Sequence, residues 1–529
     1  MSVDSKIILT MTTGTPDERA ECEMYSPTST SFNRRLQIFL CATVTLVVVV
    51  AAIRAGVCWW NARYLTPTNG VWLALATDLK DGLFYRPLLS PVGYGGTRYF
   101  PLFFVLYALL LKLGVPVLLS GYLLSAAAIA LLLVGTYCLM KGLGAEPWFA
   151  ACSAGAVLAA GSVQLSLLSI HDDGLACALN ICGLATISHP RLTRSRISLA
   201  SALFTLAWST KVTTAFGFAA AFFWLILAGF SGKAWELAAE TACGYLVVAA
   251  GMFFASHGRI VTIFKSCASA GTSPIRTLLG PFHMLSVAVR DDPGLLLFFF
   301  LALIVLPNRK AQSLSVLFFI TTIAVTAFIF GSPGTSWNHL LDLQVASVIV
   351  IAAWLADKGA PVLKQVGTYS FALATLLAAI PVVHLLQAED RVYPPRRFER
   401  AIALILDSHK PILAENPLLP VLAGQRPYVM DPFMFRVVGQ HIPHFADTLF
   451  EGLQKQAFSA VVLTKDAQTA AGKTWYQNDI FGPGFLAALS ERYRVASVLD
   501  DQYIYLPTSA ASPAAEAGTP PRERSIREH

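Results

Sequence analysis

Arg34 and Arg35 are followed at residues 36–53 by LQIFLCATVTLVVVVAAI, an apolar run of 18 residues. A run of this length can cross the hydrocarbon core of a bilayer as a helix. It begins too late and is too long for a cleavable signal peptide. Because basic residues favour the cytoplasmic side of a span, the arginine pair predicts that the chain enters the membrane from the cytoplasm.

Ten further apolar runs predict a polytopic α-helical membrane protein of about eleven spans. These runs lie at residues 119–140, 148–168, 174–188, 197–209, 212–230, 236–256, 293–306, 311–331, 341–356 and 366–387. Residues 101–113 are too few to span and suit an interfacial or re-entrant segment. With that assignment, the basic residues of the short loops all fall on the inner side, as cytoplasmic loops require. These residues are Lys141, Arg191, Arg194, Arg196, Lys233, Arg309, Lys310, Lys358 and Lys364.

The composition excludes several classes of protein. Of the 529 residues, 55% are hydrophobic and 13% are charged, whereas soluble domains average about 25% charged residues. This deficit excludes a soluble multidomain enzyme and a disordered protein. The net charge of +7 comes from 39 Lys and Arg against 32 Asp and Glu, without a dense basic stripe, so we expect no nucleic-acid partner. The nine irregularly spaced cysteines predict neither a disulfide framework nor a zinc site.

Polarity divides the chain into four regions. Residues 1–36 are expected to be a disordered cytoplasmic segment, and residues 37–387 contain the spans. Residues 388–507 alternate short strands and helices, which predicts a small soluble α/β domain outside the membrane. Residues 508–529 are expected to be disordered. In the α/β domain, strands are expected at 411–415, 427–431, 460–464, 495–499 and 502–506, and helices at 396–407, 433–439, 445–456 and 485–492.

The long outer loop at residues 58–118 carries the first candidate site residues. Its sequence TNGVWLALATDLKDG at 68–82 predicts an amphipathic helix in the membrane interface. Asp78 and Asp81 are three residues apart and share a face of this helix. They form either a solvated polar surface or a site in which one carboxylate acts as a general base. Arg86 and Arg98, which ends the glycine-rich GYGGTR, are candidates to bind a lipid phosphate.

Charged residues also mark the outer ends of later spans. His171, Asp172 and Asp173 open the span at 174–188, where acids are costly unless they are paired or solvated. They either cap a helix or face a shared outer cavity. Lys211 lies between two spans and either reaches the surface or neutralises an anionic leaving group. The remaining candidates on the outer side are Arg259, as a further phosphate ligand, and Asn338, His339 and Asp342, as cavity residues.

The order of these features resembles that of the polytopic GT-C glycosyltransferases. An interfacial helix with Ala76, Leu79, Gly82 and Tyr85 is followed by a PLFF segment, by an Asp that opens a span and by a TK corner. The resemblance is to the bacterial group related to protein O-mannosyltransferases, the aminoarabinose transferase of lipid A and the lipopolysaccharide-core transferases of rhizobia. The NHLLD segment at 338–342 is also similar to theirs.

The resemblance implies a sugar donor linked to a polyprenyl phosphate, used on the outer face of the bacterial cytoplasmic membrane. Transfer would invert the sugar configuration, with a carboxylate activating an acceptor hydroxyl and Lys and Arg stabilising the departing phosphate. By position, Asp173 matches the family's Asp and Lys211 its corner Lys. The acceptor is a lipid, a glycan or a protein, and a divalent metal is left open as a cofactor.

One departure from the family pattern bears on catalysis. Thr68 and Asn69 stand where these enzymes usually carry an Asp-Glu pair. Either Asp78 or Asp81 takes over as the base, or Asp172 or Asp173 does, or the chain is a non-catalytic binding or scaffold protein of the same shape. A transporter is a further alternative, but the polar groups lie at span ends rather than centres and no internal repeat is present.

Overall fold

The computed structural model describes residues 27–508 except 269–272, 309, 311–312, 333, 358–360, 393–397, 406–409 and 500. The disorder predicted for residues 1–26 and 509–529 therefore lies outside the described residues. Residues 27–36 are not a separate segment, because the first helix, α2 (Pro27–Trp60), already begins there. Proline suits the first position of a helix, since its missing N–H has no intrahelical partner.

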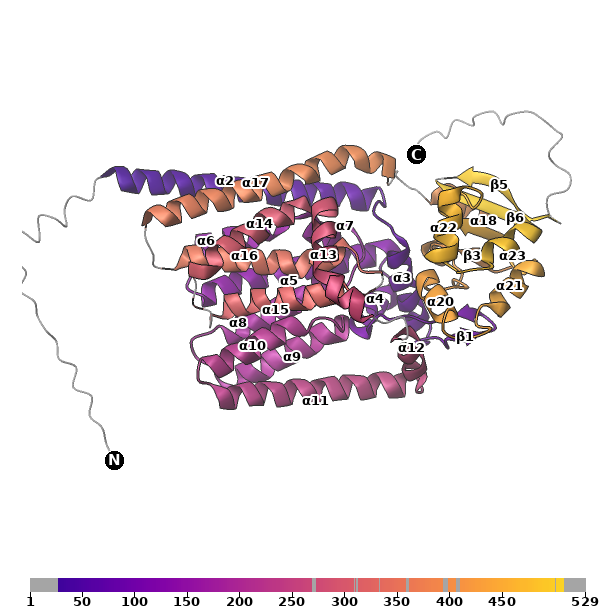
Figure 1. Cartoon of the computed structure of the whole chain (residues 1–529), viewed down its shortest axis with the longest axis horizontal. Helices are drawn as coiled ribbons and strands as arrows, with labels where there is room; N and C mark the ends of the chain where they lie inside the picture. The colour runs from indigo at the N-terminus through magenta and orange to yellow at the C-terminus, as the bar shows by residue number, and fades with distance from the viewer. Residues whose placement is uncertain are drawn as a thin grey trace, which may run out of the picture.

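Most of the chain is a bundle of roughly parallel helices that run horizontally in Figure 1. Within the described residues, each of the eleven predicted apolar runs contains at least one helix. The bundle helices are α2, α5 (Val117–Gly142), α6 (Pro147–Ala156), α7 (Gly161–Leu168), α8 (Asp173–Ile187), α9 (Arg194–Thr210), α10 (Ala215–Leu227), α11 (Ser231–Ala255), α14 (Pro293–Val305), α15 (Leu314–Ile329), α16 (Leu341–Ala356) and α17 (Pro361–Val392). Helix α16 is apolar on every side and almost wholly buried, as expected of a central helix.

Five of these helices are long and apolar enough to cross a membrane, and a bent pair adds a sixth if it counts as one span. Five shorter apolar helices accompany them. The predicted span at 148–168 is this bent pair: Pro147–Ala159 and Gly161–Leu168 meet at 81°. The bend has a physical cause, because the Asp292 carboxylate accepts hydrogen bonds from the backbone N–H groups of Gly161 and Ser162 and so fixes a new helix start.

Short helices cover the end of the bundle that lies toward the C-terminal domain (Figure 1). The predicted interfacial helix is α3 (Pro67–Lys80), and residues 101–113 form the short helix α4 (Pro101–Lys112), which packs against it. The outer loop at 257–292 contains two helices that were not predicted, α12 (Arg259–Ala268) and α13 (Pro274–Asp291). Elsewhere in the described residues, the 3-10 turn η1 (Val157–Ala159) follows α6 and η2 (Leu306–Asn308) follows α14, while η3 (Trp337–Leu340) precedes α16.

The C-terminal domain has a four-stranded mixed sheet in the order β3-β4-β6-β5, with a parallel pair β3-β4 and antiparallel pairs elsewhere. Its strands are β3 (Ile412–Ala414), β4 (Ala460–Leu463), β5 (Tyr493–Leu499) and β6 (Gln502–Pro507). Its helices are α18 (Glu399–Ile405), α19 (Leu418–Leu422), α20 (Pro432–Gly439), α21 (Asp447–Gln454), α22 (Ala470–Asn478) and α23 (Phe485–Arg492). Strands β3 and β4 are buried throughout and consist of apolar residues, as in sheets covered on both faces.

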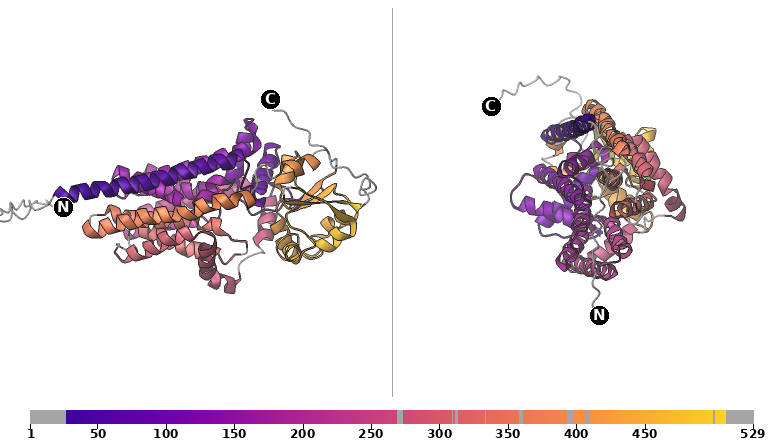
Figure 2. Two further views of the ribbon diagram at one scale, coloured as in Figure 1. Left: turned by 90° about the horizontal axis from the view of Figure 1, so that it is seen from above. Right: turned by 90° about the vertical axis from the view of Figure 1, so that its left-hand side faces the viewer.

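The expected strand at 427–431 belongs to the junction between domain and bundle rather than to this sheet. Val429 forms an isolated bridge with Tyr94 of the outer loop, which carries a small hairpin of β1 (Leu89–Ser90) and β2 (Gly93–Tyr94). Gly93 has φ +115°, and a Cβ there would lie 2.0 Å from the Tyr428 carbonyl oxygen. The glycine-rich run thus allows two backbones to meet. The domain caps one end of the bundle, as the turned view shows (Figure 2), and shares a hydrophobic core with α3 and α4.

Candidate active site

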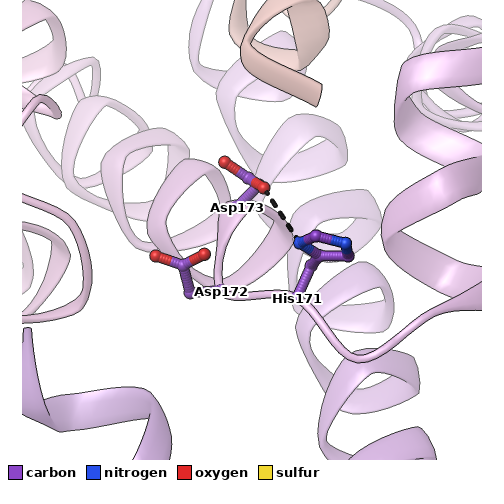
Figure 3. A group of neighbouring side chains, drawn as sticks. All are labelled: His171, Asp172 and Asp173. Atoms are coloured by element: carbon purple, nitrogen blue, oxygen red, sulfur yellow. Dashed lines mark ion pairs between the residues drawn. The ribbon is translucent and has the colours of Figure 1, made fainter. Parts of the chain in front are cut away.

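The loop between α7 and α8 brings three ionisable side chains together at the end of the bundle that lies toward the C-terminal domain. His171, Asp172 and Asp173 are all buried, with exposed fractions of 8%, 6% and 3%. The His171 Nδ1 atom lies 3.7 Å from Asp173 Oδ2 (Figure 3). Asp173 is the first residue of α8, where the helix dipole favours a negative charge.

Two other segments supply the partners of Asp173. The Lys211 ammonium at the end of α9 forms an ion pair with Asp173 Oδ1. From η3, Asn338 Nδ2 donates to Asp173 Oδ2 over 2.9 Å, and His339 Nδ1 lies 2.9 Å from Lys211 Nζ. The structure therefore joins residues that are far apart in the sequence into one group. We name this group the α8 cluster: His171, Asp172, Asp173, Lys211, Asn338 and His339.

Asp172 differs from Asp173 in having no engaged partner side chain. Among the described residues, its carboxylate accepts a hydrogen bond only from its own backbone N–H. Burial and the neighbouring Asp173 carboxylate raise the pKa of Asp172 well above its usual range, although Lys211 and Arg98 partly oppose this. In Figure 3 this carboxylate lies beside the His171–Asp173 pair without joining it. Burial also lowers the pKa of His171, which favours a neutral imidazole.

Asp342 lies at the edge of the α8 cluster, in the first turn of α16. Its side chain is buried and interacts with the thiol of Cys177 and electrostatically with Lys211. Its Oδ1 atom has no hydrogen-bond partner among the described residues. The structure therefore places Asp342 beside the α8 cluster, close enough to act electrostatically on Lys211.

Asn69, which stands in the place of the family's acid pair, supports the same loop. Its Nδ2 donates to the Ile170 carbonyl over 2.8 Å, and its Oδ1 accepts from the Thr66 backbone N–H over 2.5 Å. Asn69 thus ties the start of α3 to the residue before His171. Asn69 therefore contacts the loop of the α8 cluster, as a residue at this place would, but it provides no carboxylate.

The first pair of predicted acids belongs to a different group. Arg86 Nε and Nη2 reach the two Asp78 carboxylate oxygens over 2.5 Å and 3.2 Å, and both residues are fully buried. From the C-terminal domain, Arg426 Nε lies 3.3 Å from Asp78 Oδ1, and its Nη2 lies 3.2 Å from Asp81 Oδ2. Arg86 Nη1 donates to the Pro427 carbonyl over 2.7 Å. These four residues, Asp78, Asp81, Arg86 and Arg426, form what we name the docking group.

Arg259 also stays outside the α8 cluster. Its Nε donates to the Ser256 carbonyl over 2.8 Å and its Nη2 to the Phe84 carbonyl over 3.4 Å. These contacts connect the start of α12 to the outer loop. The guanidinium groups of Arg259 and Arg86 are thus both engaged by partners outside the α8 cluster.

Arg98 is exposed and connects the α8 cluster to the C-terminal domain. Its guanidinium lies 5.5 Å from the ring centroid of Phe433 and acts electrostatically on Asp172 and on Asp431. Burial raises the pKa of Asp431, whose Oδ1 caps α20 by accepting from the Met434 N–H over 3.1 Å. Our sequence reasoning missed Asp431 and Phe433. In the sequence, Asp431 directly before Pro432 indicates a helix cap, because proline favours the first position of a helix. Nothing in the sequence indicates that Asp431 lies near Arg98.

His171, Asp172 and Asp173 each offer one atom that could ligate a metal ion, and these atoms lie within 4.8 Å of one another. One imidazole and two carboxylates are acceptable ligands for several divalent ions. However, Lys211 and Asn338 engage the two Asp173 oxygens. The Lys211 ammonium thus already neutralises the Asp173 carboxylate, where a metal ion would have to bind. The residues as arranged therefore do not fit a resident divalent ion.

Comparison with known proteins identifies the fold. No family model matches the sequence, and no curated protein matches it in sequence. The crystal structure of ArnT from Cupriavidus metallidurans bound to undecaprenyl phosphate is similar, with a TM-score of 0.57, 14% identity, and coverage of 89% of this chain and 99% of that chain. A second similar structure is the archaeal oligosaccharyltransferase AglB from Archaeoglobus fulgidus, in complex with an inhibitory peptide and a dolichol-phosphate. Its TM-score is 0.52 at 13% identity, and the match covers 89% of this chain and 75% of that chain. The chain therefore has the GT-C fold of membrane glycosyltransferases.

Proposed function

We propose that the chain is a glycosyltransferase that moves a sugar from a polyprenyl-phosphate donor to an acceptor hydroxyl on the outer face of the cytoplasmic membrane. The observation that carries this proposal is a buried carboxylate without a partner side chain, Asp172, in the same cluster as the ammonium of Lys211, whose side chain is 14% exposed. The similar ArnT and AglB structures contain undecaprenyl phosphate and a dolichol-phosphate. These ligands support a lipid phosphate as the donor's leaving group.

Asp172 is the proposed general base. Its carboxylate would take the proton of the acceptor hydroxyl while the hydroxyl oxygen bonds to the anomeric carbon. The bond between that carbon and the lipid phosphate breaks, and the phosphate leaves with the bonding electrons, which inverts the sugar configuration. A raised pKa suits this role, since proton transfer is most efficient when the pKa of the base lies near the working pH.

Lys211 and Arg98 are the proposed ligands of the departing phosphate. Cationic donors that are already in place stabilise charge as it develops in the transition state. Asp173 and His339 hold the Lys211 ammonium from two sides, while Asn338 holds Asp173. We therefore assign Asp173, Asn338 and His339 as positioning residues. His171 and Asp342 would line the same site.

Asp78 and Asp81 are less suited to the role of base. Burial raises the pKa of Asp78 although Arg86 and Arg426 oppose this, but the two arginines engage both of its oxygens, which leaves neither free to meet an acceptor hydroxyl. Asp81 is about half exposed and pairs with Arg426. The docking group therefore favours a structural role for these two acids.

We also propose the topology that this function requires. The basic residues of the predicted inner loops include Lys141 and Arg196, which line one pocket with His189 after the last turn of α8, at the opposite end of that helix from Asp173. Cytoplasmic loops are enriched in such residues. The N-terminus would then lie inside, and the α8 cluster and the domain at 388–507 outside. Eleven spans, the third of them bent between α6 and α7, would give this arrangement.

A genetic experiment tests the proposal. A deletion strain, an Asp172→Asn strain and an Asp81→Asn strain are compared with wild type by mass spectrometry of their surface glycans and lipids. We expect the deletion and Asp172→Asn to remove the same sugar modification, and Asp81→Asn to keep it. An unchanged glycan profile in the deletion strain would overturn the glycosyltransferase proposal. Loss in the deletion but not in Asp172→Asn would overturn Asp172 as the base and favour the scaffold alternative.

A further inference from the structure

A groove lies at the opposite end of the bundle from the α8 cluster, between α5 and α8. Its volume is about 560 Å³, within the range of roughly 300–1,000 Å³ usual for small-ligand sites. Its walls are largely apolar or uncharged and include Val134 and Cys138 of α5 and Ala185 of α8. The two helices can approach closely here, because a Cβ at Gly142 would lie 2.1 Å from Ser188 Oγ.

Three basic side chains surround one end of this groove: Lys141 at the end of α5, His189 after α8, and Arg196 in the first turn of α9. Among the described residues that line the groove, none is acidic. Outside the lining, Glu236 of α11 lies 2.8 Å from Lys233 and 3.4 Å from Arg194, Glu240 accepts a hydrogen bond from Ser198, and Lys141 Nζ donates to the Ala145 carbonyl over 3.0 Å. The groove therefore has a basic end, without an acid in its described lining, and an apolar length.

We propose that this groove binds an anionic glycerophospholipid, with its phosphate at Lys141 and Arg196 and an acyl chain along α5 and α8. Basic pockets between membrane helices on the cytoplasmic side are suited to acidic lipid headgroups. Val134, on the wall of the groove, is 59% exposed, as expected of a side chain that meets acyl chains. A soluble phosphate would fill only the basic end and leave the apolar length empty.

The site is independent of the proposed transferase reaction. Helix α8 joins the two sites, with Asp173 at its first residue and the groove around Cys182 and Ala185 near its last turn. A helix of 15 residues is about 22 Å long, so a lipid headgroup in the groove does not reach the α8 cluster. The charge and shape of the groove carry the inference whether or not the chain transfers a sugar.

The test is a lipid titration of the purified full chain, followed by native mass spectrometry. The probes are phosphatidylglycerol and phosphatidylcholine of the same acyl composition. We expect preferential binding of phosphatidylglycerol, and a loss of affinity of roughly fivefold for each cation removed in Lys141→Gln and Arg196→Gln. Arg194→Gln is the matched control, because Arg194 lies on the same helix end, is 83% exposed and pairs with Glu236 outside the groove.

A steric variant separates the groove from general surface charge. Cys138 is exposed and lines the groove, so Cys138→Trp should fill the groove and displace phosphatidylglycerol without any change in charge. Equal binding of the two lipids would overturn the proposal. So would an Arg194→Gln effect as large as that of Arg196→Gln, or stronger competition by undecaprenyl phosphate than by phosphatidylglycerol.

Discussion

Two groups of acidic and basic side chains lie near the junction between the bundle and the C-terminal domain, and each contains a buried carboxylate. The docking group joins two acids of the α3 region to Arg86 and Arg426, and all four side chains are engaged in ion pairs. The α8 cluster joins two adjacent acids to Lys211, but only Asp173 is engaged by it and Asp172 has no partner side chain. In the first group the acids connect two domains, and in the second one acid stays available to accept a proton.

The difference shows that the identity of a charged residue says little about its role until its partners are known. Carboxylates buried with two guanidinium groups are neutralised and held by directed hydrogen bonds. A carboxylate buried beside another acid has a raised pKa and can exchange a proton near neutral pH. The predictions below test whether the two groups have these separate roles, in structure and in chemistry.

The largest effect is expected from Asp78→Ala. This variant leaves the fully buried Arg86 without its carboxylate, and removal of one partner of a buried pair typically costs about 3–5 kcal/mol. We expect a correspondingly lower free energy of unfolding, measured by chemical denaturation of the purified protein, together with faster proteolysis at the junction between bundle and domain. Asp81→Ala is the control, since its side chain is 46% exposed and should contribute less than about 1 kcal/mol.

Lys211→Gln should lower transfer activity by about 10²–10³-fold, because removal of one preorganised donor to a developing anion has an effect of that size. The measurement is kcat/KM for sugar transfer by the protein in liposomes. Lys211→Arg keeps the charge beside Asp173 and should recover part of the lost rate. If Lys211→Gln lowered the stability but left kcat/KM of the folded fraction unchanged, the lysine would belong to the structure alone, like Arg86.

The pH dependence of sugar transfer should distinguish the α8 cluster from the docking group, with a smaller effect than Lys211→Gln. A general base must be ionised, and burial beside Asp173 raises the pKa of Asp172, so activity should fall as the pH drops through a value well above the usual pKa of about 3.9. Below that value, kcat/KM should fall about tenfold for each pH unit. Asp173→Asn removes a neighbouring negative charge and should move this fall to lower pH, whereas Asp81→Asn should leave the profile in place.

Much of the fold could be predicted from the sequence because its signals are local. Long apolar runs predict helices, and α2 and α5 contain the runs predicted for them, although α2 begins nine residues earlier than its run. The bend between α6 and α7 could not be predicted, since it depends on a carboxylate about 130 positions away in the chain, at Asp292. In the same way, the expected strand near Val429 pairs with Tyr94 rather than with its own sheet.

The candidate site could be predicted in part for the same reason. The resemblance drew attention to Asp173 and Lys211, and the structure places them in contact. The sequence did not show which acids were already paired, because the guanidinium that engages Asp81 is 345 positions away, at Arg426. From the sequence, Asn69 indicates only that an acid is absent at this position. In the structure it contacts the Ile170 carbonyl and so stabilises the loop that carries His171.

The smallest effect is expected from Arg426→Gln. The Arg426 side chain is 44% exposed, and Asp78 keeps its buried pair with Arg86 when Arg426 is replaced. Solvent screening therefore limits the expected loss to at most about 1 kcal/mol in the free energy of unfolding. Lys455→Gln, which breaks an exposed pair with Glu451 within the C-terminal domain, is the matched control and should cost less. A loss as large as that of Asp78→Ala would instead mean that the docking group is coupled throughout and acts as one unit.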